Sequence, residues 1–391
     1  MRFPPQIRRF AGHSSAATFL WPPRRSWPGG SAGVGRNWRT CWVRSDPGGA
    51  GVVVLRPPRA REMRGTMPVR VGFVGAGGIA GAHMNSLEKV ENAQIVAFAD
   101  VDESRAQRAA ARFGARAYPS CAAMLANEEL QAMYVCVPPF AHSDAELQAA
   151  AKGIHLFIEK PVAISMEKAC EIQAAVESAG ILTSVGYHWR SYDVTEQVRT
   201  ELASRTVGMV MGYWVGGLPG VPWWRRMDGS GGQMVEQTTH IVDLARYYCG
   251  EIRSVYAAYA LCTMQDVENL DVPDVGAMVV EFESGLIGHI ANGCLLDQGY
   301  TVGLNLLTRD LVVEQRHGTV KFLRRNETTE IRTQVNPTVV EDQTFIDAVE
   351  TGDGSRIKSP YGDAVRTLAV TLAGNLSATH RERVDVAEVL A

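Results

Sequence analysis

Residues suited to proton transfer occur at two places in the sequence. The first is the tripeptide Glu159-Lys160-Pro161, which directly follows the apolar run at residues 154–158. Lys160 therefore stands at the end of an expected strand, beside a proline that fixes the turn through a cis bond or through its restricted φ. From this position an ammonium group can reach an oxygen atom of a bound substrate and stabilise negative charge on it. The alternative is a surface lysine paired with Glu159.

The second place is the stretch at residues 233–248, whose pattern predicts one helix. Glu236, His240 and Asp243 are spaced i, i+4 and i+7 there, so they would share one helix face. An imidazole has a pKa near neutrality and suits the role of base for a hydroxyl proton, with Glu236 or Asp243 to hold it. The alternatives are a core histidine capped by Asp243 and part of a metal site. No third ligand pattern supports a metal, so no metal is expected.

The stretch at residues 69–100 has the pattern of a dinucleotide-binding unit. An apolar run at 69–74, expected as a buried strand, ends in a G-x-G-x-x-A turn; a helical stretch to about Val90 and a second strand at 95–99 follow. The first glycine permits a tight bend, the second lets the backbone approach a pyrophosphate, and the alanine lets the helix lie close to the strand. The helix N-terminus directs free N–H groups at the phosphates. The turn consists of Gly75, Ala76, Gly77, Gly78, Ile79 and Ala80.

An acidic residue ends the second strand at the distance that such a unit requires. Asp100 lies 20 residues after Ala80, where its carboxylate can accept hydrogen bonds from both ribose hydroxyls. The carboxylate would repel a 2′-phosphate and Arg105 is the one nearby base, so NAD is favoured, with NADP as the alternative. The other residues expected near the cofactor follow later strands and are Pro138, Pro139, His142, Glu159 and Lys160.

Strand and helix patterns alternate through residues 67–187. Apolar strand patterns at 132–137, 154–158 and 182–187 are separated by helical stretches. This alternation predicts an α/β domain with a doubly wound parallel sheet of the Rossmann type, in which functional residues gather at the carboxyl ends of the strands.

The pattern changes after residue 187. Residues 188–391 predict an α+β domain with a large, open, mainly antiparallel sheet, and the closing helices of this domain can pack back on the first one. One hairpin of the sheet turns at Ser284-Gly285. Because an open sheet of this kind often packs against a twin, we expect a homodimer or homotetramer that associates through it.

Composition excludes several classes of partner. The whole chain has a formal net charge of −3, and residues 1–66, with 12 arginines and two acidic residues, carry +10. Residues 67–391 therefore carry −13, which argues against nucleic acid as a partner. No apolar run is long enough to span a membrane. The seven cysteines are scattered and favour a reducing compartment, here the cytoplasm. Residues 1–66 have no sustained period; we expect them to be disordered and outside the natural product.

From residue 67 onward the chain resembles the Gfo/Idh/MocA oxidoreductases. The resemblance rests on five motifs in the right order: the glycine turn with Asp100, VCVPPFAH, the E-K-P tripeptide, GGQMVEQTTHIVDLARY and EDQTFIDAVETG. It implies a Rossmann domain followed by an open-faced sheet domain, with substrate bound between them beside the nicotinamide. It also implies that Lys160 hydrogen-bonds the reacting oxygen, and that His240 and the acid four residues before it contact substrate. That acid is Glu236, where the family usually has Asp.

The combined expectation is an NAD(P)-dependent dehydrogenase acting on CH–OH donors. It would move a hydride between the nicotinamide and a secondary alcohol of a sugar, polyol or related hydroxy compound. Lys160, His240 and Glu236 would be the catalytic residues. The alternatives are an NAD-dependent glycosidase of the same fold and a non-catalytic dinucleotide-binding regulator. Weaker candidates for substrate contact are His188, Arg190, Trp223, Trp224, Arg225 and Asp243.

Overall fold

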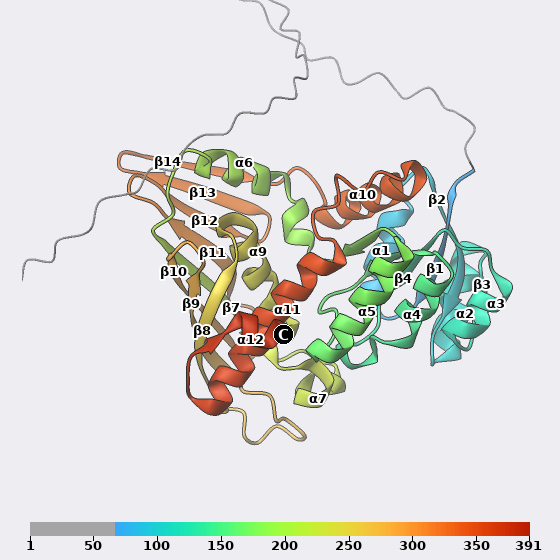
Figure 1. The fold of residues 1–391 in the computed structure, drawn as a ribbon, viewed down its shortest axis with the longest axis horizontal. Helices are drawn as coiled ribbons and strands as arrows, with labels where there is room; N and C mark the ends of the chain where they lie inside the picture. The colour runs from blue at the N-terminus through green and yellow to red at the C-terminus, as the bar shows by residue number, and fades with distance from the viewer. Residues whose placement is uncertain (1–66) are drawn as a thin grey trace, which may run out of the picture. The chain divides into compact units, whose positions relative to one another are not determined.

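Six parallel strands form the first sheet of the computed structural model, which describes residues 67–391 (Figure 1). The predicted disordered extension at 1–66 lies outside the described residues. The strand order is β3-β2-β1-β4-β5-β6, the order of a Rossmann sheet, so the chain reverses direction across the sheet between β1 and β4. The strands are β1 (Val69–Val74), β2 (Ala93–Ala99), β3 (Arg116–Tyr118), β4 (Ala132–Val135), β5 (His155–Ile158) and β6 (Thr183–Val185).

Two apolar cores, one on each face, show that this sheet is doubly wound as predicted. Helices α1 (Gly78–Leu87) and α2 (Glu103–Phe113) cover one face; α3 (Cys121–Asn127), α4 (Asp144–Ala151) and α5 (Met166–Ala179) cover the other. The sequence at 103–113 has a helical pattern, and α2 has these bounds because Asp102 caps its first turn and Gly114 ends it in the left-handed conformation.

The last long helices of the chain complete both cores. Helix α10 (Pro337–Thr351) lies against α1 (Figure 1) and buries Phe345 among the aromatic residues of the first face, including Tyr134 and Phe157. Helix α11 (Tyr361–His380) packs against α5 on the second face and also against the second sheet.

The second sheet has nine strands in the order β14-β13-β12-β11-β7-β10-β9-β8-β15. Every neighbouring pair is antiparallel except β10 and β7. The predicted hairpin with a turn at Ser284-Gly285 is confirmed. The strands are β7 (Met209–Gly217), β8 (Ile252–Ala260), β9 (Val275–Phe282), β10 (Ile287–Leu296), β11 (Thr301–Leu307), β12 (Val312–Arg316), β13 (Thr319–Arg324), β14 (Glu327–Arg332) and β15 (Val384–Asp385).

Within the described part of the chain, helices cover only one face of this sheet. A core cluster packs α6 (Asp193–Leu202), α9 (Thr239–Cys249), α11 and α12 (Val386–Leu390) against that face. On the opposite face apolar side chains are exposed, among them Tyr256 and Val279, which are neighbours in the register of β8 and β9. No helix between residues 67 and 391 is both long and apolar enough to cross a bilayer.

The single helix predicted for residues 233–248 is wrong. The chain forms a short helix α8 (Gln233–Glu236) and then, after a break at Gln237 and Thr238, the longer α9. The amide of His240 bonds the carbonyl of Gln237 at 3.3 Å instead of that of Glu236. In a continuous helix the carbonyl oxygen of Glu236 would accept the amide of His240. Because that bond is not made, the oxygen is available to another donor.

Candidate active site

The carboxyl ends of the parallel strands open into a cavity of about 1100 Å³. This volume is slightly above the usual range for small-molecule sites, roughly 300–1000 Å³, and suits a long ligand. Residues of the short helix η3 (Pro222–Arg225) and of α8 also line it. Among the predicted site residues, the cavity is lined by Gly75, Ala76, Gly77, Gly78, Ile79, Asp100, Arg105, Pro138, Pro139, Glu159, Lys160, Trp223 and Glu236.

The glycine turn has the geometry that a pyrophosphate requires. Gly75 has a φ of +88°, and a Cβ there would lie 2.3 Å from the carbonyl oxygen of Cys136, so only glycine fits. At Gly77 and Gly78 a Cβ would meet no atom within 4 Å, because the backbone borders open space. Helix α1 begins at Gly78 without a side-chain cap and without an acidic residue in its first turn. Its first N–H groups remain available, and the turn fits a dinucleotide.

The carboxylate of Asp100 joins the second strand to this turn. It accepts hydrogen bonds from the backbone N–H of Ala76 at 2.7 Å and of Asp102 at 2.8 Å, which fixes its position at the cavity wall. The remaining lone pairs of both oxygens can accept ribose hydroxyls. Arg105 lines the same part of the cavity, and so does Arg108, which the sequence reasoning missed.

Lys160 points toward Glu236 rather than toward its neighbour Glu159. Its Nζ donates to the carbonyl oxygen of Glu236 at 2.9 Å and to the carboxylate oxygen Oε1 at 2.8 Å. The Lys160–Pro161 peptide bond is cis, one of the two expected conformations. The break between α8 and α9 provides the carbonyl acceptor, so it contributes directly to the position of the ammonium group.

The second carboxylate oxygen of Glu236, Oε2, also accepts a hydrogen bond. The indole Nε1 of Trp224 donates to Oε2 at 2.6 Å. Trp224 is almost fully buried, whereas its neighbour Trp223 lines the cavity. The two tryptophans therefore have different surroundings, although the sequence predicts substrate contact for both.

His240 is buried and does not line the cavity. Its ring stacks on Trp214 and makes an edge contact with His188, with ring centroids 5.8 and 4.7 Å away. Burial, with smaller contributions from His188 and Lys160, lowers the pKa of His240 well below its ordinary value of 6.5. The imidazole is consequently neutral at pH 7, and its buried Nδ1 has no hydrogen-bond partner among residues 67–391.

The expectation that Glu236 or Asp243 holds His240 is wrong. Glu236 is committed to Lys160 and Trp224, and it belongs to a different helix from His240. Asp243 forms a buried, two-point ion pair with Arg190, with N–O distances of 2.7 and 2.6 Å. Arg190 and Asp243 thus pair with each other in the interior, and neither of them lines the cavity.

A buried hydrogen-bonded triad lies behind the Lys160 turn. His83 of α1 bonds Glu159 through Nε2 and Asp342 of α10 through Nδ1, both at 2.9 Å. Although burial acts in the opposite direction, the two carboxylates raise the pKa of His83 well above 6.5, so the triad contains an imidazolium. Glu159 also accepts the backbone N–H of Lys160 at 3.1 Å. The sequence pattern places His83 within the first helix but does not reveal partners so distant in the chain.

Four other predicted residues lie outside the lining of the cavity. Ala80 is buried between α1 and the sheet, as its packing role requires. His142 is buried and bonds Glu146 at 2.6 Å, His188 contacts His240, and the backbone carbonyl of Arg225 accepts the amide of Asp271 at 3.0 Å.

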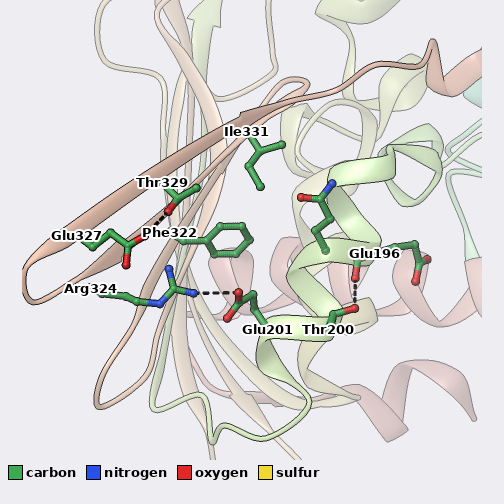
Figure 2. Close-up of a pocket in the computed structure, with 9 residues that line it drawn as sticks. Glu196, Thr200, Glu201, Phe322, Arg324, Glu327, Thr329 and Ile331 are labelled. Atoms are coloured by element: carbon green, nitrogen blue, oxygen red, sulfur yellow. Dashed lines mark hydrogen bonds and ion pairs between the residues drawn. The ribbon is translucent and has the colours of Figure 1, made fainter. Parts of the chain in front are cut away.

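A second hollow, of about 620 Å³, lies between α6 and strands β13 and β14 (Figure 2). Arg324 pairs there with Glu201 at 2.9 Å, and the hydroxyl of Thr200 donates to the carbonyl of Glu196. None of the predicted site residues lines this hollow. The strand-end cavity is therefore the candidate active site.

The fold and the cavity define a two-part oxidoreductase with an NAD-binding Rossmann domain. Residues 69–187 match the description "Oxidoreductase family, NAD-binding Rossmann fold", and residues 203–320 match the "GFO/IDH/MocA C-terminal domain". Together these matches cover more than half of the chain. The protein belongs to the Gfo/Idh/MocA oxidoreductase family, as its motifs predict.

Characterised relatives and solved structures are consistent with this membership. The chain is 28% identical to inositol 2-dehydrogenase of Rubrobacter xylanophilus, over 61% of this chain and 69% of the relative. It is 24% identical to myo-inositol 2-dehydrogenase of Thermotoga maritima, over 59% and 70%. Levoglucosan dehydrogenase in complex with NADH and L-sorbose shares the fold with a TM-score of 0.75 at 17% identity, over 82% of this chain and 99% of that one.

Proposed function

We propose that this protein is an NAD-dependent dehydrogenase that oxidises a secondary alcohol of a sugar, a polyol or a related hydroxy compound. One observation carries the proposal: Lys160 and Glu236 line the same cavity as the glycine turn and Asp100. The turn, the N-terminus of α1 and Asp100 would hold the dinucleotide. When bound, NAD supplies the hydride acceptor.

Lys160 is suited to bind the reacting oxygen. An ammonium group has three N–H donors, and two of them are taken by the carbonyl and the carboxylate of Glu236. The third is left for a substrate oxygen, on which negative charge develops as the alcohol is oxidised. A fixed, partly buried cation stabilises that charge more strongly than water does.

His240 is suited to accept the hydroxyl proton. A base must be unprotonated before the reaction, and the lowered pKa of His240 satisfies this condition at neutral pH. The charge of Lys160 contributes to this lowering of the pKa. Because His240 is buried and does not line the cavity, its role as base requires that the bound substrate come within reach of the ring. We assign the base to His240 and the stabilising charge to Lys160, with Glu236 as the residue that orients the ammonium group.

The substrate class is supported by the relatives and by the cavity wall. The characterised relatives named above are inositol dehydrogenases. Trp223 offers an aromatic surface of the kind on which the apolar face of a sugar ring stacks. Each carboxylate oxygen of Glu236 has two lone pairs and accepts one described side-chain bond, so the remaining lone pairs can accept substrate hydroxyl groups.

A substrate screen tests the proposal. The purified protein is mixed with sugars, polyols and hydroxy acids together with NAD or NADP, and the absorbance of the reduced cofactor is followed. We expect turnover of at least one polyhydroxy compound, faster with NAD. Absence of calorimetric binding of either dinucleotide would contradict the proposal. Cleavage of a glycoside without accumulation of NADH would instead identify the glycosidase alternative.

The organisation of the protein is proposed on the same basis. We assign residues 67–187 to the cofactor domain and 188–391 to the substrate domain, and we propose a homodimer or homotetramer through the open face of the nine-stranded sheet. The exposed Val279 and Tyr256 support this, because large exposed apolar patches mark interfaces. V279D should lower the mass measured by light scattering.

Unpaired cysteines in the described chain support a cytoplasmic location.

A further inference from the structure

Glu236 is held from two sides by donors of different kinds. Lys160 donates to Oε1 at 2.8 Å, and the indole Nε1–H of Trp224 donates to Oε2 at 2.6 Å. An N–H donor that bonds a carboxylate contributes more than a neutral pair does. Trp224 has a relative exposure of only 1%, so this bond is shielded from water.

The indole itself is fixed by a small apolar cluster outside the main cores. Trp224 packs there with Val272 and Cys294. The loop that carries Val272 is fixed in turn by Asp274, whose carboxylate accepts the backbone N–H groups of residues 262, 263 and 264 at 2.7–3.0 Å. The indole N–H therefore approaches Glu236 from a rigid support.

The length of the side chain at position 236 is matched to this support. An aspartate is shorter by one C–C bond, about 1.5 Å, and with the backbone in place its carboxylate would recede from both donors. The distances from the carboxylate to Trp224 and Lys160, now 2.6 and 2.8 Å, would both exceed hydrogen-bond range. The glutamate is thus able to bridge the two donors where a shorter aspartate is not.

We propose that Trp224 is a positioning residue: its indole N–H fixes the Glu236 carboxylate so that the other oxygen orients Lys160 toward the substrate. This inference rests on the proposed function, since it assigns Trp224 to the site of that reaction. Trp224 does not line the cavity, so it acts through Glu236 rather than on the substrate. Without the indole N–H, Oε2 loses its one described donor and the carboxylate can rotate away from Lys160.

A double-mutant cycle tests the assignment. W224F removes the N–H and keeps an aromatic ring in the cluster, and E236D withdraws the carboxylate. We expect W224F alone to lower kcat/KM by about tenfold or more, the effect of one hydrogen bond to a charged group. In the E236D background, W224F should have almost no further effect, because the bond is already lost.

W189F is the matched control, since Trp189 is equally buried but packs against Tyr192 and His317. Any loss from W189F should add to that of E236D. Additive losses for W224F and E236D would overturn the proposal, because they would show that Trp224 matters only for packing. Thermal unfolding of each variant confirms that folded protein is compared.

A magnetic-resonance measurement keeps the proposal testable apart from catalysis. The indole N–H proton of Trp224, assigned by its absence in W224F, should resonate downfield in the wild-type protein and move upfield in E236D. An unchanged resonance in E236D overturns the proposal even if the enzyme is active. If no substrate is oxidised and no dinucleotide binds, the proposed function fails, and the resonance still decides whether the indole holds Glu236.

Discussion

The substitution K160M removes the ammonium group that lies next to Glu236 in the cavity. Methionine has nearly the same length and no charge, so the turn and the cavity wall keep their shape. The ammonium group makes two bonds to Glu236 and leaves one N–H for the substrate. The variant therefore lacks a single charged donor to the reacting oxygen.

Removal of one preorganised donor to a developing oxyanion lowers kcat by about 10²- to 10³-fold, equivalent to roughly 2.7–4 kcal/mol of transition-state stabilisation. Cofactor affinity should change little, since the glycine turn, α1 and Asp100 are intact. The expected pattern is a large fall in kcat with a near-native dissociation constant for NAD.

The assay follows the absorbance of reduced cofactor with saturating NAD and the best substrate from the screen, and calorimetry measures NAD binding. K168M is the control, because Lys168 is a partly exposed lysine of α5 that is paired with Glu171 and lies outside the cavity lining. It should retain wild-type kinetics. A fall in kcat of less than about tenfold in K160M would refute the assignment of Lys160 as the stabilising charge.

Three further predictions concern cofactor choice and pH. D100N removes the charge that opposes a 2′-phosphate, so the ratio of kcat/KM for NADP to that for NAD should rise by about tenfold or more; an unchanged ratio argues against this role. Because the pKa of His240 is lowered, the acidic limb of kcat/KM should lie below pH 6.5, and a limb at higher pH would exclude His240 as the base. Burial raises the pKa of Asp274, but the backbone N–H donors outweigh it and the pKa lies below the ordinary value of 3.8. The ionised carboxylate therefore stabilises the folded protein above pH 3.8, and this stabilisation is lost as the pH falls through the pKa of the folded state. Thermal unfolding of wild type and D274N should differ most near neutrality and converge in acid, and a difference that grows in acid would contradict the sign of this shift.

Local patterns were sufficient for most of the cofactor half, but they did not reveal the short strand β3 or helix α3. The turn at residues 75–80 combines a strand, glycines and a helix within a short segment, so each part can be inferred from its neighbours. The same holds for α2, whose cap residues are adjacent to it, and for the hairpin at Ser284-Gly285. These features depend on contacts between residues close in sequence.

The interior of the site could not be inferred in this way. The apolar residues on both sides of Gln237 keep helical spacing, Met234 and Val235 being followed seven residues later by Ile241 and Val242, so the pattern does not show that the helix breaks there. The compensating contact comes from Lys160, 76 residues earlier in the chain. The bond between Trp224 and Glu236 likewise depends on the packing of a loop around Val272. Long-range contacts of this kind leave no periodic trace in the sequence.

Helix α10 has a consequence for the order in which the chain can fold during synthesis. Phe345 and Ile346 occupy the interior of the first sheet's core, and Asp342 balances the charge of His83. The leading half of the polypeptide leaves the ribosome well before these residues are translated. Its hydrophobic layer stays incomplete until then, so we expect the two halves to fold as one cooperative unit, in contrast to the usual succession of domains.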